Sequence, residues 1–353
     1  MFFLVACLVL LERRLGMASN MRRAERSCLA VINSDVDELM LSSSGGVFSV
    51  LARRTINNNG AVYGHAFDEG LHVACVRADN LDDLAAMRGS KYVQSDMGDA
   101  MVSVRRDLKA GREVLFSGTP CQVDGLLSFL GGPQDGLLTV DIVCHGVPSQ
   151  AFFVDCMSWE SRHGRLDEVR FRDKREGWGC SGGTTIAATT PIFHRLVTCD
   201  KPFSPEVSYY YKRFLSGDVY RESCYRCPYA GGERPGDFTI GDFWGIDLES
   251  SGLDGRHGIS LVIANTVKGE KAIPFIKDAM VWRERPLEEA IFGNDQLIHP
   301  TVRPDDRDKV LNRWLEEGIG VLEGEYKRMT AISSKKWRAK RMVKRALKRV
   351  AGR

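Results

Sequence analysis

The 353-residue sequence has no run of about eighteen apolar residues, the length that a helix needs to cross a bilayer. It also has no internal repeat, which argues against solenoid and propeller architectures. Apolar residues make up 43% of the chain and charged residues 27%, so the composition is neither disordered nor fibrous. The length exceeds the usual size of one hydrophobic core, and we expect one large domain or two intimate ones.

The chain has little net charge, +3 in all, but its basic residues are unevenly spread. Residues 327–353 contain twelve Lys or Arg and no acidic residue, which leaves 37 basic and 46 acidic residues in residues 1–326. An acidic body of this kind argues against a nucleic-acid partner. The tail over 335–353 has the pattern of a basic amphipathic helix, which favours peripheral contact with an anionic membrane. The alternative is that it docks on the acidic body or on an acidic ferredoxin.

The sequence lacks a secretory signal in its usual order. The apolar residues 1–11 precede the charged residues 12–14, whereas a signal peptide has its positive charges first. Met17 and Met21 follow, so the start of the chain in the cell is open. We expect a cytoplasmic protein whose ten cysteines stay reduced, which favours metal or redox chemistry over disulfides.

From Ser42 onward, short apolar runs alternate with segments of helical periodicity, which is typical of an α/β protein. We expect mixed sheets with flanking helices, an N-terminal α/β subdomain packed on a larger cysteine-containing C-terminal subdomain, and a basic C-terminal helix. The predicted divisions are an N-terminal extension and two domains followed by a helical tail, over residues 1–35, 36–132, 133–310 and 311–353.

The same patterns predict individual elements. Strands are predicted over residues 61–67, 71–76, 113–116, 137–143, 168–172, 183–189 and 259–265. Helices are predicted to begin at Val47 and over residues 81–87, 100–108, 122–130, 148–159, 208–215 and 268–279.

Four cysteines give the strongest functional signal. Cys121 and Cys144 stand at predicted strand-to-helix junctions, and Cys224 and Cys227 form a C-x-x-C motif followed by proline. Glycine and proline beside cysteines let the backbone approach a cluster and donate amide hydrogens to its sulfurs. Four thiolates could hold either a [4Fe–4S] cluster or zinc, and the spacings match no zinc-finger or ferredoxin pattern. The residues alone leave both metals open.

Cys121 has a second interpretation. A cysteine at the start of a helix has a lowered pKa, because exposed amides and the helix dipole favour the thiolate. Cys121 could therefore be a nucleophile, with His65 or His145 as its base, although no sequence spacing links either histidine to it.

Three segments suit a phosphate or a nucleotide. Residues 42–46 place serines and glycines at a predicted helix N-terminus, where an anion is favoured. Residues 89–95 combine a lysine, hydroxyls and a tyrosine, and residues 118–122 form a third candidate nest. There is no Walker loop, and no G-x-G-x-x-G follows directly on a predicted strand. Residues 237–245 carry two aspartates and a Phe-Trp pair, which suit stacking on a planar ring or packing in a core.

Together these motifs resemble the coenzyme F-420 hydrogenase/dehydrogenase beta-subunit family. The matching segments are Ser44-Gly45-Gly46, Gly89-Ser90-Lys91-Tyr92-x-Gln94-Ser95, Phe116-x-Gly118-Thr119-Pro120-Cys121-Gln122, Asp141-x-x-Cys144-His145-Gly146-x-Pro148-Ser149, Cys224-x-x-Cys227 and Thr239-x-Gly241-Asp242-Phe243-Trp244-Gly245. They follow one another in the order of the family, over about two thirds of the chain.

The resemblance implies an iron–sulfur flavoprotein that moves electrons between a [4Fe–4S] cluster, FAD and an acceptor. It implies that Lys91 favours a reduced, negatively charged flavin and that Lys91 and Cys121 are the candidate catalytic residues. The implied cluster ligands are Cys121, Cys144, Cys224 and Cys227. The implied flavin-side residues are Ser44, Gly45, Gly46, Gly89, Ser90, Lys91, Tyr92, Gln94, Ser95, Gly118, Thr119, Pro120 and Gln122.

One departure from the family bears on its partners. Many relatives begin with a ferredoxin-like segment that carries repeated C-x-x-C motifs, and no C-x-x-C precedes Ser42 here. We therefore expect a separate ferredoxin or other redox protein as electron donor. The general character of the sequence, including its basic tail, is similar to the bacterial form encoded near surface-polysaccharide enzymes. This similarity suggests polysaccharide-biosynthesis enzymes as partners. It also leaves coenzyme F420 in doubt as the substrate. A third hypothesis is a non-catalytic accessory protein of a glycan-assembly complex.

Overall fold

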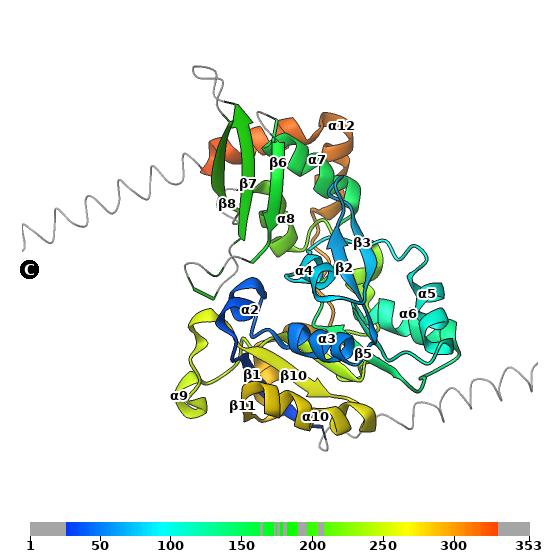
Figure 1. Ribbon diagram of the computed structural model, residues 1–353. Coiled ribbons are helices and arrows are strands. Elements are labelled where there is room, and N and C mark those ends of the chain that lie inside the picture. The colour runs from blue at the N-terminus through cyan, green and yellow to red at the C-terminus, as the bar shows by residue number, and fades with distance from the viewer. Residues whose placement is uncertain are drawn as a thin grey trace, which may run out of the picture.

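The computed structural model describes residues 26–162, 165–172, 174, 177–178, 182–189, 196–203 and 208–330. Eight strands form one mixed sheet: β1 (Cys28–Asn33), β2 (Ala61–Phe67), β3 (Val73–Ala78), β4 (Val114–Gly118), β5 (Leu137–Ile142), β9 (Phe238–Asp242), β10 (Ser260–Ala264) and β11 (Met280–Glu284). Their order is β11-β1-β10-β9-β5-β4-β2-β3 (Figure 1). A second, antiparallel sheet contains β6 (Arg165–Arg170), β7 (Gly182–Thr189) and β8 (Leu196–Phe203).

The longer helices are α3 (Val47–Asn57), α5 (Ala100–Lys109), α6 (Pro120–Leu130), α7 (Gln150–Glu160), α8 (Tyr209–Ser216), α10 (Val267–Ala279) and α12 (Arg307–Glu317). The shorter ones are α2 (Val36–Leu41), α4 (Leu81–Met87), α9 (Leu248–Ser251), α11 (Leu287–Phe292) and the 3₁₀ turns η3 (Glu222–Arg226), η4 (Gly255–His257) and η5 (Asp295–Leu297). None of the helices among these described residues is long and apolar enough to cross a membrane.

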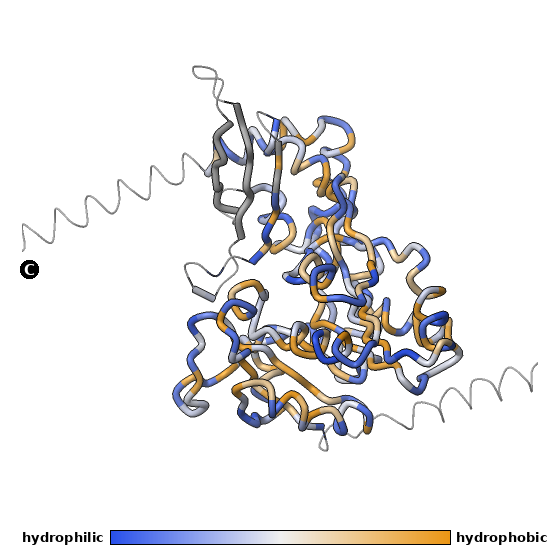
Figure 2. The backbone as a smooth tube through the Cα atoms, in the orientation of Figure 1, coloured by the Kyte–Doolittle hydropathy of each residue, from blue (hydrophilic) through white to orange (hydrophobic). Residues whose placement is uncertain are grey.

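The two faces of the large sheet are buried by different helices. On one face, Leu115 of β4 belongs to a core that includes Leu51 of α3 and Ile276 of α10. On the other face, Phe116 packs with Val104 of α5. Successive residues of a strand point to opposite faces, so a strand covered on both sides is apolar throughout. Figure 2 shows this hydrophobic character along the strands of the large sheet.

The direction of the strands determines where the loops meet. The strands β2, β4, β5 and β9 are parallel. Because β1 pairs antiparallel with β10, which pairs antiparallel with β9, β1 also points the same way. The segments that follow these five strands therefore leave the sheet at one edge. In α/β proteins the carboxyl edge of a parallel sheet is where ligands bind.

A second core lies beside the large sheet and is built from aromatic rings. It joins α7, α8 and α12, which Figure 1 shows next to β6. Phe152 and Phe153 of α7 are fully buried against Tyr210 of α8. The Trp314 ring of α12 lies nearly perpendicular to the Phe152 ring, with a centroid distance of 5.2 Å.

The predicted α/β class, with a mixed sheet and flanking helices, is confirmed. The helix predicted over 81–87 and the strand predicted over 61–67 have the observed bounds. The large sheet takes strands from both predicted domains. The basic helix predicted over 335–353 lies outside the described residues.

A buried carboxyl pair holds the helical residues 319–330 against α7. Glu323 is fully buried, and its carboxyl group faces Glu160 and Lys327. Lys327 Nζ lies 3.5 Å from Glu323 Oε2 and 3.1 Å from Glu160 Oε1, so one cation faces two carboxyl groups. Burial, and then the neighbouring Glu160, raise the pKa of Glu323 above its usual value of 4.5. The protonated form of Glu323 is therefore favoured in the folded chain.

We expect the Glu323→Gln variant to change how stability depends on pH. The unfolded chain loses the Glu323 proton near pH 4.5 while the folded chain keeps it, so the wild type should lose stability as the pH rises above that value. Glutamine removes this loss, so the melting temperature of the variant minus that of the wild type should grow from about pH 5 to about pH 8. Glu316→Gln on the exposed face of α12 is the control for the change in charge. If the difference in melting temperature stayed constant from about pH 5 to about pH 8, the raised pKa of Glu323 would be contradicted.

Candidate functional site

The four predicted cysteine ligands come together at the carboxyl edge of the large sheet. Cys121 is in the first turn of α6, directly after β4, and Cys144 is the second residue after β5. Cys224 lies in η3, and Cys227 follows it. Burial, and then the thiols of Cys224, Cys121 and Cys227, raise the pKa of Cys144 to about 12. The four side chains are therefore close enough to interact electrostatically; we call them the cysteine quartet.

The cysteine quartet does not have the geometry of a site for a single ion. Among the residues that the structure describes, no three Cys, His, Asp or Glu side chains are arranged to hold one metal ion. A zinc ion with four thiolates at about 2.3 Å needs its sulfurs within about 4 Å of one another. As a donor set for an iron–sulfur cluster, four cysteine thiols are complete. The residues present therefore fit that group in the chemistry of their side chains.

Backbone contacts connect the segments that carry Cys144 and the C-x-x-C motif. The Arg221 N–H donates to the Val147 carbonyl at 3.0 Å. Pro148 and Tyr220 form an antiparallel bridge at the same place. Cys144 and Cys224 each lie within four residues of these contacts, so their separation is set by the backbone.

Cys121 is exposed at the N-terminus of α6, which is closed by a capping box. Gln122 Oε1 accepts hydrogen bonds from the backbone N–H and the hydroxyl of Thr119, both at 2.9 Å. Cys121 Sγ lies 3.1 Å from Thr119 Oγ1. No hydrogen bond within the described part of the chain joins Cys121 to His65 or His145, so the nucleophile hypothesis gains no base from this geometry.

Two of the predicted flavin-side loops touch each other. The backbone N–H and the hydroxyl of Ser90 donate to Ser43 Oγ at 2.6 and 2.8 Å. Gly46 occupies the N-cap of α3 with a φ of 86°, a left-handed conformation that favours glycine. The N-cap makes no side-chain hydrogen bond to the first amide groups of this helix, which is the end that favours an anion.

Basic side chains surround the junction of these loops. Arg53 and Arg88 both donate to the buried carboxylate of Glu38. Lys174 donates to the Leu39 and Ser44 carbonyls, and burial lowers its pKa to about 8. Two guanidinium groups thus share one carboxylate, and the Lys174 ammonium lies on the Ser44 carbonyl, which leaves positive charge beside the start of α3.

Lys91 and His65 lie beside one another near these loops. Lys91 Nζ donates to the carbonyls of Ala86, Arg88 and Gly89, at the end of α4. Burial lowers the pKa of Lys91 to about 7, whereas these three carbonyls favour its charged form. Burial, and then Lys91, lower the pKa of His65 to about 4, so its imidazole is neutral. His65 Nδ1 lies 2.7 Å from Ser95 Oγ, and Nε2 has no partner among the described residues.

Tyr92 and Gln94 connect the same loop to its surroundings. The Tyr92 ring stacks on Phe214 of the aromatic core, with centroids 4.4 Å apart and planes 6° apart. The Gln94 N–H donates to the Pro148 carbonyl at 3.0 Å, which joins this loop to the segment after Cys144. The contacts of both residues in the structure hold the loop in place, and their contact with a cofactor stays a prediction.

An aromatic and charged cluster at the end of β9 was only partly visible in the sequence. Trp244 is 38% exposed and stacks on Trp178, with ring centroids 4.5 Å apart and planes 10° apart. Arg172 makes two hydrogen bonds to Asp242, and the Trp178 indole donates to the same carboxylate. Phe243 is fully buried. Of the Phe-Trp pair, Phe243 therefore lies in the core and Trp244 at the surface. Nothing in the sequence pattern predicts the hydrogen bonds of Arg172 to Asp242.

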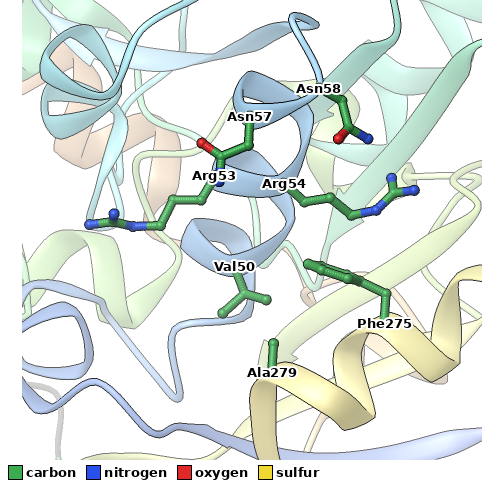
Figure 3. Close-up of a pocket in the computed structure, with 7 residues that line it drawn as sticks. All are labelled: Val50, Arg53, Arg54, Asn57, Asn58, Phe275 and Ala279. Carbon is green, nitrogen blue, oxygen red and sulfur yellow. The ribbon is translucent and has the colours of Figure 1, made fainter.

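A surface hollow of about 530 Å³ lies elsewhere, between α3 and α10 (Figure 3). Figure 3 shows Arg54 and Phe275 on its walls, and the Arg54 guanidinium lies 5.2 Å from the centre of the Phe275 ring. It contains none of the predicted site residues. The hollow is also on a helical face rather than at the loop edge, so it does not mark the site.

Comparisons with known proteins agree with the motifs. The family described as the C-terminal part of the coenzyme F420 hydrogenase/dehydrogenase beta subunit matches residues 111–290, which include the whole cysteine quartet. No curated protein matches the chain. Among solved structures, the chain is similar to one from a xenon-derivatised F420-reducing [NiFe] hydrogenase complex of Methanosarcina barkeri, with 15% identity, a TM-score of 0.48, and 83% of this chain and 94% of that chain covered. Because the family match covers just over half of the sequence, the predicted resemblance is confirmed, and the protein belongs to this family of hydrogenase and dehydrogenase beta subunits.

Proposed function

We propose that the protein is an iron–sulfur flavoprotein oxidoreductase. In this proposal the cysteine quartet holds a [4Fe–4S] cluster, and the loops of residues 42–46 and 89–95 bind FAD. Electrons pass between these two groups and an external acceptor. The observation that carries the proposal is the meeting of four cysteines, from three separate stretches of chain, at the edge of the sheet where ligands bind.

The chemistry of the donor set supports iron–sulfur over zinc. Thiolates are the ligands of both metals, but zinc would require the sulfurs to converge on one point. An iron–sulfur cluster fills the space between its ligands with its own iron and sulfide. Besides burial, the thiols of Cys121 and Cys227 raise the pKa values of both Cys144 and Cys224, so the four groups lie near one another, and this donor set suits the larger group.

The start of α3 supports a dinucleotide form of flavin. Its uncapped amide groups, the Ser43 and Ser90 hydroxyls and the nearby Arg88 and Lys174 are all suited to a diphosphate. The flavin supplies the electron or hydride chemistry, and the protein supplies position and charge. Lys91 is our candidate for stabilising negative charge on the bound ring.

The proposal includes a ferredoxin or other redox protein as electron donor. Coenzyme F420 is one candidate acceptor, since the family description names it. A role beside polysaccharide-biosynthesis enzymes, in the cytoplasm or at the inner face of the membrane, rests on the basic residues 335–353 and remains part of the proposal. The rival to all of this is an accessory protein that carries neither flavin nor iron.

A comparison of flavins tests the binding site. Flavin-free protein titrated under argon should bind FAD at least about tenfold more tightly than riboflavin, because only FAD places a diphosphate at the start of α3. Flavin fluorescence measures both affinities on the same sample. Equal affinities would show that the start of α3 does not bind the diphosphate, and no binding of either compound would contradict the flavin assignment.

A further inference from the structure

We propose that Arg234 is a positioning residue that fixes the C-x-x-C loop against the segments that carry Cys144 and Cys121. The inference rests on the proposed function only in what the cysteine quartet holds. The arrangement of the thiols themselves is a property of the chain and is tested separately below.

The Arg234 guanidinium connects two of the cysteine-bearing segments. Its Nε and Nη2 donate to Asp141 Oδ1 at 3.0 and 2.6 Å, and Nη2 also donates to the Ile142 carbonyl at 2.7 Å. Asp141 and Ile142 are the last residues of β5, just before Cys144. On its other side, Nη1 donates to the Tyr229 carbonyl at 2.8 Å, two residues after Cys227. One planar side chain therefore sets the distance between the two segments.

Tyr229 extends the connection to the fourth cysteine. Its hydroxyl donates to Asp124 Oδ2 at 2.7 Å, in the first turns of α6, which begins beside Cys121. The backbone of Tyr229 is thus held by Arg234 while its ring reaches the helix of Cys121. We call this pair the Arg234–Tyr229 tie, and it links all the segments of the cysteine quartet.

Burial makes the position of the guanidinium rigid. Arg234 is 3% exposed, and Asp141 is fully buried. The Asp141 carboxylate also accepts hydrogen bonds from the Gly236 N–H at 2.8 Å and from the Thr239 hydroxyl at 2.9 Å. A buried ion pair adds little net stability compared with apolar residues of the same volume. Its geometric effect is larger, because a guanidinium fork accepts few arrangements of its partners.

Lysine at this position would keep the positive charge but would lose the planar guanidinium group with its several donors. One ammonium group cannot reach both Asp141 and Tyr229 with the same geometry, so Arg234→Lys should fold but leave the C-x-x-C loop free to shift. The matched control is Arg77→Lys. Arg77 holds Asp107 through two hydrogen bonds of 2.7 and 3.2 Å, and among the described residues its side-chain hydrogen bonds go to Asp107 and Asp79, outside the segments of the cysteine quartet.

The closing experiment measures the thiols and the iron in parallel on the full-length chain. Metal-free protein is treated with dibromobimane, which bridges two neighbouring thiols, and the Cys144–Cys227 and Cys144–Cys224 products are quantified by mass spectrometry. We expect Arg234→Lys to lower their yield about tenfold relative to wild type and to Arg77→Lys. In anaerobically prepared protein, Arg234→Lys should also bind less than half the wild-type iron and give an altered EPR line shape on reduction, and Tyr229→Phe should have a smaller effect in the same direction.

The outcomes separate the two claims. An Arg234→Lys variant with the wild-type yield of bridged thiols would overturn the positioning role, whatever the protein binds. A wild type that bridges its thiols efficiently but holds no iron would overturn the proposed function and leave the positioning role of Arg234 standing.

Discussion

Replacing Cys144 with serine is expected to abolish iron binding while the chain stays folded. Cys144 is the second residue after β5 of the large sheet, and burial and the thiols of Cys224, Cys121 and Cys227 raise its pKa. Serine has nearly the same size, but its hydroxyl is not a thiolate ligand. Iron and sulfide per chain, measured on anaerobically purified variant, should fall to background.

Cys75→Ala provides the control for this prediction. Cys75 is also a partly buried free cysteine with a pKa raised by burial, but it lies in β3 and belongs to no cysteine-bearing loop. This variant should keep the iron content of the wild type. If Cys144→Ser also retained it, Cys144 would not be a ligand and the donor set would need revision.

Gly45→Ala is expected to be the most destabilising change in the flavin-side loops. A Cβ at Gly45 would lie 2.1 Å from the Val31 carbonyl oxygen and 2.5 Å from the Ser260 backbone nitrogen. Both atoms belong to the strands β1 and β10, whose pairing prevents them from moving aside. Overpacking against fixed backbone should cost about 3 kcal/mol in the free energy of unfolding and displace the start of α3. FAD binding should be lost with it.

Gly89→Ala separates a clash from a simple change of backbone preference. Gly89 has a φ of 77°, but a Cβ there would meet no atom within 4 Å. The Gly89→Ala substitution should therefore lower the free energy of unfolding by only about 1 kcal/mol, the penalty of a left-handed conformation for alanine. Urea unfolding and FAD titration of both variants make the comparison. Equal free energies of unfolding would contradict the close packing of Gly45 on β1 and β10.

The sequence was most informative where a reactive side chain directly follows a predicted strand. Cys121 and Cys144 were recognised because glycine, proline and a short apolar run mark each strand end. Parallel strands then bring such ends to one edge without any further information. Elements with one clear period, such as α4 and β2, were predicted with their observed bounds.

Long-range contacts were not visible in the sequence. The strand β1 was missed because nothing near it marks its pairing with β10, more than two hundred residues away. Arg234 reaches Asp141 across 93 positions, and Lys174 reaches Ser44 across 130, so no local pattern links either pair. Tyr92 shows the converse. Its motif suggests a ring offered to a cofactor, while the aromatic residues of α8 provide a packing partner that only the fold reveals.

The central claim is that this chain carries a flavin and an iron–sulfur cluster together. The most direct test is an absorbance spectrum with iron, sulfide and flavin quantitation on anaerobically purified full-length protein. The account predicts one flavin and about four irons with matching sulfide per chain. Folded protein with neither flavin nor iron would contradict it and would favour an accessory role instead.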